Sequence, residues 1–147
     1  VNVDAIVGRL NGVVAAVCRD RDGVFMGAST VVFPNLSDPG VLETLAIREA
    51  LALGEDLYAR RIHVASDCKV AVDNIHHLYK GSYGAIVHEI MQYRLSFETC
   101  NIIHEFRSSN IEARKLAKHA LSLGVGRHAW LGQPNELDFV PVNIVTT

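Results

Sequence analysis

The spacing of apolar and polar residues predicts an alternation of short strands and longer helices. The first segment, 1–7, is rich in β-branched residues and carries one acid, Asp4, in its middle, which predicts a buried or half-buried strand. Two further strands are expected over 13–19 and 24–33, because glycine-rich and Asp-Gly turns separate them. Three strands joined by such short turns form an antiparallel meander.

Helical periodicity begins after the loop 34–40, PNLSDPG, whose second proline suits the first turn of a helix. Apolar residues of 41–61 cover most of the helix circumference, so this helix is expected to pack centrally against the sheet. The later elements predicted are a strand over 62–67, helices over 69–79 and 85–97, a strand over 101–106 and a helix over 110–123. The order is three strands, helix, strand, two helices, strand, helix.

This order predicts an α/β fold with a five-stranded mixed sheet flanked by helices. The first three strands are antiparallel, and the later strands, reached through helical crossovers, run parallel to the first. A chain of 147 residues with 49% hydrophobic side chains suits one core. We therefore expect one domain over 1–126. The segment 127–147 loses periodicity and predicts an extended C-terminal tail that packs on the domain or on a neighbour.

Charge and cysteine content limit the partners and the compartment. The formal net charge is -2 and the pI about 6.4, so a nucleic-acid partner would have to be held by a local basic patch. Cys18, Cys68 and Cys100 are far apart and lack metal-ligand spacing, which favours a reducing intracellular compartment, cytoplasmic or nuclear. No apolar run approaches a membrane span, and no signal peptide is recognisable. The first residue, Val1, suggests a domain cut from a longer polypeptide.

Asp67 is the first candidate for chemistry, because in IHVASDCKVAV it ends a strand and precedes a helix. Open α/β sheets usually bind ligands at such positions. A parallel crossover would bring Asp4 beside Asp67, and Glu43, near the start of the crossover helix, could reach the same place. Each acid also has a plainer interpretation: Asp67 as a helix cap shared with Ser66, Asp4 as an edge-strand acid, and Glu43 as a helix-dipole acid.

Three converging carboxylates repel one another and lose hydration, so they stay ionised only if cations hold them. Hard oxygen ligands select Mg²⁺ or Mn²⁺. Two such ions, about 3.5 to 4 Å apart, would clamp the attacking and leaving oxygens of a phosphodiester displacement. The pattern therefore predicts metal-dependent phosphodiester chemistry.

The chain resembles the RNase H-like domains, most closely those of plant retroelement (non-LTR) reverse transcriptase-type polypeptides. The resemblance spans nearly the whole chain and rests on the order of NVDAIV, CRDRDG, ETLAIREALALG, VASDCKVAVDNI, NIEARKLAKHA and WLGQPNEL. It implies an RNase H-like fold with Mg²⁺ or Mn²⁺ on Asp4, Glu43 and Asp67. It also implies hydrolysis of the RNA strand of RNA/DNA hybrids by two metals, a proton-transfer role for His104, and Asn110 near the substrate backbone. Each of these two residues also has a plainer interpretation: His104 as a surface or sheet histidine, and Asn110 as a helix-start residue.

The resemblance fails at the fourth acidic position, where NIEARKLA places Arg114. A guanidinium only donates hydrogen bonds and cannot ligate a metal, so Arg114 would instead pair with the acids and compete with Mg²⁺. The cations expected to contact substrate phosphates are Arg107, Arg114, Lys115 and Lys118, although a solvated helix face is an equal alternative. The rival function is a catalytically degenerate module that binds nucleic acid or a protein partner.

Overall fold

The computed structural model describes residues 1–78, 81 and 83–131. Its elements are β1 (Asn2–Val7), β2 (Asn11–Arg19), β3 (Phe25–Pro34), α1 (Pro39–Asp56), β4 (Arg61–Ser66), α2 (Lys69–His76), α3 (Gly84–Arg94), β5 (Thr99–His104), the short 3-10 helix η1 (Arg107–Asn110), α4 (Ile111–Ala120) and β6 (Gly126–Leu131). The predicted element order is confirmed up to α4, with boundaries that differ by a few residues.

The sheet contains six strands among the described residues, in the order β5-β4-β1-β2-β3-β6, and not the five predicted. The first three strands are antiparallel, and β1, β4 and β5 are parallel to one another, as predicted. The additional strand, β6, begins at Gly126 and pairs antiparallel with β3. It therefore occupies the start of the segment that was expected to be an extended tail. Residues 132–147 lie outside the described residues, and the domain boundary stays a prediction.

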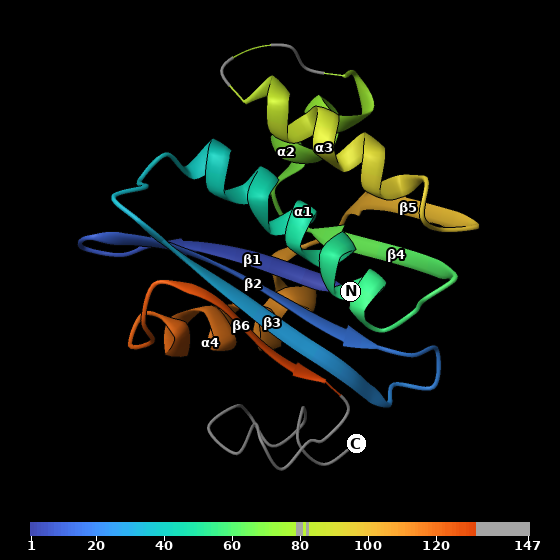
Figure 1. Cartoon of the computed structure of the whole chain (residues 1–147), viewed down its shortest axis with the longest axis horizontal. Helices are drawn as coiled ribbons and strands as arrows, with labels where there is room; N and C mark the ends of the chain where they lie inside the picture. The colour runs from blue at the N-terminus through green and yellow to red at the C-terminus, as the bar shows by residue number, and fades with distance from the viewer. Residues whose placement is uncertain (79–80, 82, 132–147) are drawn as a thin grey trace.

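Helices cover both faces of the sheet, with α1, α2 and α3 on one side and α4 on the other (Figure 1). Alternation along β2 explains the two layers. Val14 and Ala16 point into the core under α1, whereas Val13, Ala15 and Val17 point into a second core under α4. The central strands are thus buried on both faces, which fixes the positions of side chains at their ends.

Helix α1 begins where the sequence predicts. Asp38 is its N-cap, and the carboxylate accepts hydrogen bonds from the backbone N–H groups of Gly40 and Val41. Pro39 follows in the first turn, where its missing N–H costs nothing. The loop 34–40 therefore sets the start of the helix that carries Glu43. None of the described helices combines the length and apolarity that a membrane crossing requires.

Candidate active site

Asp4 and Asp67 are brought together by the register of two parallel strands. Asn2 of β1 is aligned with Ala65 of β4, so two further steps along each chain place Asp4 beside Asp67, just beyond the end of β4. Asp4 is on a central strand and only 2% exposed. The alternative of a solvent-facing edge-strand acid is therefore wrong.

Glu43 completes the group from the first turns of α1. One carboxylate oxygen from each of Asp4, Glu43 and Asp67 lies within 4.8 Å of the other two. Asp4 is buried, and the other two acids are partly buried. Three elements distant in sequence thus deliver three acids to one point at the edge of the core.

The electrostatic environment disfavours three negative charges without a counterion. Burial raises the pKa of Asp4 above its ordinary value, and the charge of Asp67 adds to this, while the backbone N–H of Ala5 and the Arg114 guanidinium oppose it. Burial also raises the pKa of Glu43 to about 8, with further contributions from the charges of Asp4 and Asp67. A cation bound among the acids would relieve both effects.

The donor set fits a divalent metal ion. Oε2 of Glu43 is buried and has no hydrogen-bond partner among the described residues. Buried polar atoms normally find a partner, so this orphaned oxygen is available as a ligand. Three carboxylates are hard oxygen donors of the kind that Mg²⁺ and Mn²⁺ take. Asp4, Glu43 and Asp67 therefore could hold such an ion.

Two guanidinium groups approach the acids from the η1–α4 side. Nη1 of Arg114 lies 3.4 Å from Oδ2 of Asp4, and Nε of Arg107 lies 3.9 Å from Oδ2 of Asp67. Arg114 is about one third exposed, whereas Arg107 is largely in solvent. The expected pairing of Arg114 with an acid is present, and Arg107 adds a weaker contact that the sequence pattern did not indicate.

The helix-cap interpretation of Asp67 is not what the structure shows. The N-cap of α2 is Cys68, and its side chain makes no capping hydrogen bond. Ser66 supplies a local contact instead, because its Oγ accepts a hydrogen bond from the backbone N–H of Cys68 at 3.1 Å. The Asp67 carboxylate thus belongs to the acid cluster and does not cap the helix.

His104 and Asn110 stay outside the acid cluster. His104 is exposed on β5, opposite Ser66, and its ring makes an edge contact with Phe106. Asn110 is 2% exposed at the N-cap of α4, and neither polar atom of its side chain has a partner among the described residues. Its burial places Asn110 behind the surface, so substrate contact by this residue stays a prediction.

A basic hollow of about 440 Å³ lies next to the acids. Its lining consists of Arg107, Ser108, Ile111, Arg114, Lys115 and Lys118. The four predicted substrate-binding cations therefore gather on one surface. Sequence reasoning missed the exposed Phe106 immediately before this segment, because an aromatic residue at a strand end reads as core; the flanking Glu105 and Arg107 were the available signal.

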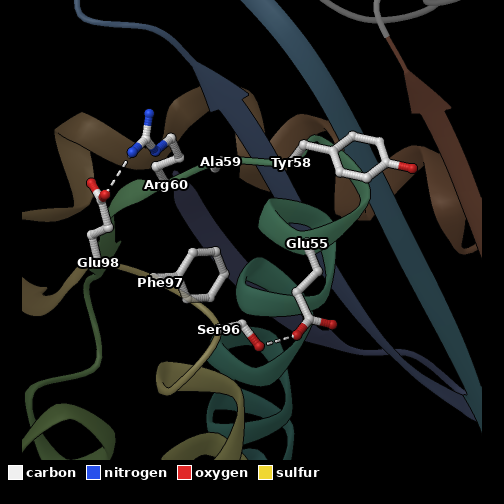
Figure 2. A pocket seen from close by; sticks show the side chains of 7 residues that line it. All are labelled: Glu55, Tyr58, Ala59, Arg60, Ser96, Phe97 and Glu98. Carbon is white, nitrogen blue, oxygen red and sulfur yellow. Dashed lines mark hydrogen bonds and ion pairs between the residues drawn. The ribbon is translucent and has the colours of Figure 1, made fainter.

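A second hollow of similar volume lies at the other end of α1, away from the acids (Figure 2). Ser96 donates a hydrogen bond to Glu55, and Arg60 forms an ion pair with Glu98. The ring of Tyr58 points away from Phe97 and is 90% exposed. The charged groups here are already paired, so this hollow lacks the concentration of unbalanced charge seen at the acid cluster.

Solved structures of other proteins share this fold. RNase H1 from the halophilic archaeon Halobacterium salinarum superposes with a TM-score of 0.76 at 17% identity, covering 84% of this chain and 96% of that one. The N-terminal RNase H domain of a Mycobacterium tuberculosis protein gives 0.72 at 19% identity, covering 82% and 94%. LC11-RNase H1, solved in complex with an RNA/DNA hybrid, gives 0.67 at 18% identity, covering 82% and 97%. The fold is RNase H-like.

The chain belongs to the reverse transcriptase-like family, whose sequence model matches residues 2–120. The matched range contains all three acids, both arginines beside them and the whole basic hollow. Comparison with curated proteins gave no match.

Proposed function

We propose that this chain is an RNase H-type endonuclease domain that hydrolyses the RNA strand of RNA/DNA hybrids with Mg²⁺ or Mn²⁺. The observation that carries the proposal is the convergence of Asp4, Glu43 and Asp67, whose ligand oxygens lie within 4.8 Å of one another in an RNase H-like fold. The hybrid seen with LC11-RNase H1 supports the choice of substrate.

The three acids hold and orient the metal site in this proposal. Two divalent ions bound there would activate water and neutralise charge on the scissile phosphodiester. Asp4 and Asp67, fixed by strand register, set the position of the site relative to the sheet. Glu43 supplies the oxygen that no described residue uses.

The chain's cations would bind the substrate backbone. Arg107, Lys115 and Lys118 face solvent beside the acids, where they would contact phosphates without reading base sequence. Selection of RNA would follow from the shape of the hybrid and its 2′-hydroxyls. We propose that His104, exposed one strand away, helps a proton reach the leaving group.

The biological setting follows from the same resemblance. We propose a plant retroelement reverse transcriptase-type polypeptide as the parent, supported by the order of the motifs along 2–137. The three cysteines are free thiols in the structure, in keeping with a reducing compartment, cytoplasmic or nuclear.

A second candidate is a catalytically degenerate RNase H-like module that binds nucleic acid or a protein partner. The observation that favours it is the 3.4 Å contact between Arg114 and Asp4, which gives the buried acid a counterion without any metal. Because the guanidinium stays protonated, it would oppose metal entry at every physiological pH.

A gel assay of labelled RNA/DNA hybrid separates the two candidates. We expect the wild-type protein to cleave the RNA strand in Mg²⁺ or Mn²⁺, and Arg114→Asp to cleave faster because it removes the competing charge and adds an acid. Arg48→Asp is a matched control, since Arg48 of α1 pairs with Glu89 of α3, away from the acid cluster. A hybrid left intact by the wild type in both metals would refute the nuclease proposal. Activity gained only in Arg114→Asp would identify the wild type as degenerate.

A further inference from the structure

The exposed aromatic ring of Phe106 has no role in the proposed reaction. Its side chain is 79% exposed, although it follows directly on a strand of the sheet. Among the described residues its aromatic neighbour is His104, with ring centroids 5.8 Å apart and planes at 71°. An edge-to-face pair of this kind steadies the ring and leaves most of its surface open.

The residues that follow Phe106 form a continuous basic surface. Arg107 and Ser108 belong to η1, and the exposed face of α4 presents Ile111, Arg114, Lys115 and Lys118. Their spacing of three, four and seven residues places them on one stripe of the helix. The opposite stripe, Ala113, Leu116, Ala117 and Ala120, is buried against the sheet.

The charges on this surface are available to an anion. Lys115 and Lys118 are exposed and form no ion pair with the described residues. Arg107 is 70% exposed and only loosely paired with Asp67. A polyanion lying along α4 would therefore meet at least three cations without breaking a close salt bridge.

We propose that Phe106 and the basic face of α4 form a binding site for single-stranded nucleic acid beside the acid cluster. One unpaired base would stack on Phe106, while neighbouring phosphates lie over Arg107, Lys115 and Lys118. A ring combined with a cationic track is the arrangement that binds single strands with little sequence preference. A paired base inside a duplex would not suit this site, because its faces are covered by its neighbours.

The inference rests on the proposed function only in taking a polynucleotide as the ligand, and it requires no cleavage. On a hybrid substrate, the site would hold the unpaired segment that adjoins the duplex. It would thus direct the acid cluster toward junctions between hybrid and single strand.

Binding in EDTA tests the inference independently of catalysis. The probes are single-stranded RNA and single-stranded DNA of about 12 nucleotides, a length within the range such sites cover, and a blunt RNA/DNA hybrid of the same sequence. We expect Phe106→Ala to weaken single-strand binding about 5- to 20-fold, the loss expected for one stacked base. Binding of the blunt hybrid should change by less than about twofold, because no unpaired base is lost.

Two variants control for exposure and for aromatic character. Tyr58→Ala removes another largely exposed ring, at the far end of α1, and should leave affinity unchanged. Phe106→Trp should retain binding and quench the fluorescence of 2-aminopurine in the probe, whereas Phe106→Leu should lose the quenching. Lys115→Ala with Lys118→Ala should reduce the salt dependence of log K by roughly 0.7 per lysine removed.

The outcomes distinguish this inference from the nuclease proposal. Equal binding by Phe106→Ala and wild type, or an equal loss for Tyr58→Ala, overturns the single-strand site. So does a wild-type protein that cleaves the hybrid but binds neither single strand, and that result leaves the nuclease proposal intact. A wild type that binds single strands through Phe106 but never cleaves refutes only the nuclease. Comparison of the RNA and DNA probes shows whether the 2′-hydroxyl contributes.

Discussion

Glu43 and Glu49 lie six residues apart on the same helix, yet their carboxylates have opposite surroundings. Glu49 is 4% exposed, and Nε of Arg127 lies 2.6 Å from its Oε1, while the same guanidinium lies 2.6 Å from Asp56. Glu43 instead faces two other acids, and its buried Oε2 has no partner among the described residues. Glu49 thus has a counterion within the protein, whereas Glu43 lies among like charges.

The contrast separates an acid with a structural partner from an acid that we propose binds a metal ion. Arg127 belongs to β6, so the Glu49 contact ties the outer strand to α1. Among the described residues Glu43 forms no comparable ion pair, and burying it beside like charges costs stability. Proteins usually keep such destabilising groups where the group has a function, so the unfavourable burial of Glu43 supports the choice of this site.

The largest expected effect follows from removing a charge from the proposed metal site. Asp67→Asn should lower Mg²⁺-dependent hybrid cleavage by roughly 1,000-fold or more, because metal clamps contribute several kcal/mol to transition-state stabilisation. Asp73→Asn is the matched control, since Asp73 is a half-exposed acid six residues later that pairs with Lys69. Initial rates on labelled hybrid measure both. If Asp67→Asn retains the wild-type rate, the acid cluster is not the catalytic centre.

The second effect is a pH dependence of stability to which the unpaired acid, Glu43, makes the largest contribution among the three clustered acids. In the folded protein the pKa of Glu43 is about 8, above its ordinary value of 4.5. Between these values the native state holds a proton that the unfolded state has lost, so the free energy of unfolding falls as pH rises. The slope is at most about 1.4 kcal/mol per pH unit, and the shift from 4.5 to about 8 gives a total of about 5 kcal/mol.

Urea unfolding in EDTA at several pH values between 5 and 8.5 measures this term, with pH steps of about one unit to match the slope. Glu43→Gln should flatten the curve, whereas Glu55→Gln, an exposed acid on the same helix, should leave it unchanged. Addition of Mg²⁺ should restore stability at the alkaline end, because a bound cation favours the ionised form. An unchanged slope in Glu43→Gln would contradict the assigned environment of this side chain.

The third effect is on the free energy of unfolding, which should change in opposite directions when Glu49 and Glu43 are replaced by glutamine. Glu49→Gln should destabilise the protein by about 1 to 2 kcal/mol, below the roughly 3 to 5 kcal/mol seen for fully buried pairs. The discount applies because Arg127 is 37% exposed and keeps Asp56 as a partner. At pH 8, Glu43→Gln should instead stabilise the metal-free protein. Chemical denaturation of both variants at that pH measures the difference, and equal signs would remove the distinction between the two acids.

These two acids also show what the sequence could and could not predict. Periodicity and crossover topology predicted the order of elements, and together with the family resemblance they predicted the convergence of Asp4, Glu43 and Asp67. These predictions were possible because strands and helix starts have recognisable local sequence patterns. The partner of Glu49 could not be inferred, since it depends on β6. In β6, Arg127 is at an exposed position, and His128 and Trp130 are at partly buried positions. Polar residues therefore occur on both faces of the strand, and the sequence shows no apolar alternation. Its pairing with β3 is a tertiary contact that propensity does not record.

Side-chain exposure was likewise beyond the sequence pattern. Phe106 looks like a core residue and is exposed, whereas Asn110 looks like a surface cap and is buried. Both lie where β5 gives way to η1, a short irregular segment whose geometry is set by packing against β1 and α4. Irregular connections have no period from which an inward face can be deduced.

The smallest expected effect concerns the two guanidinium groups beside the acids. Arg114 lies 3.4 Å from a buried carboxylate, whereas Arg107 is 70% exposed and 3.9 Å from Asp67. Solvent screens the second contact more strongly, so Arg114→Gln should raise Mn²⁺ affinity about 5- to 10-fold and Arg107→Gln only about twofold. Isothermal titration with Mn²⁺ measures both. A wild-type affinity unchanged by Arg114→Gln would show that Arg114 does not compete with the metal, and the 3.4 Å contact would then resemble the Glu49 pair in being structural.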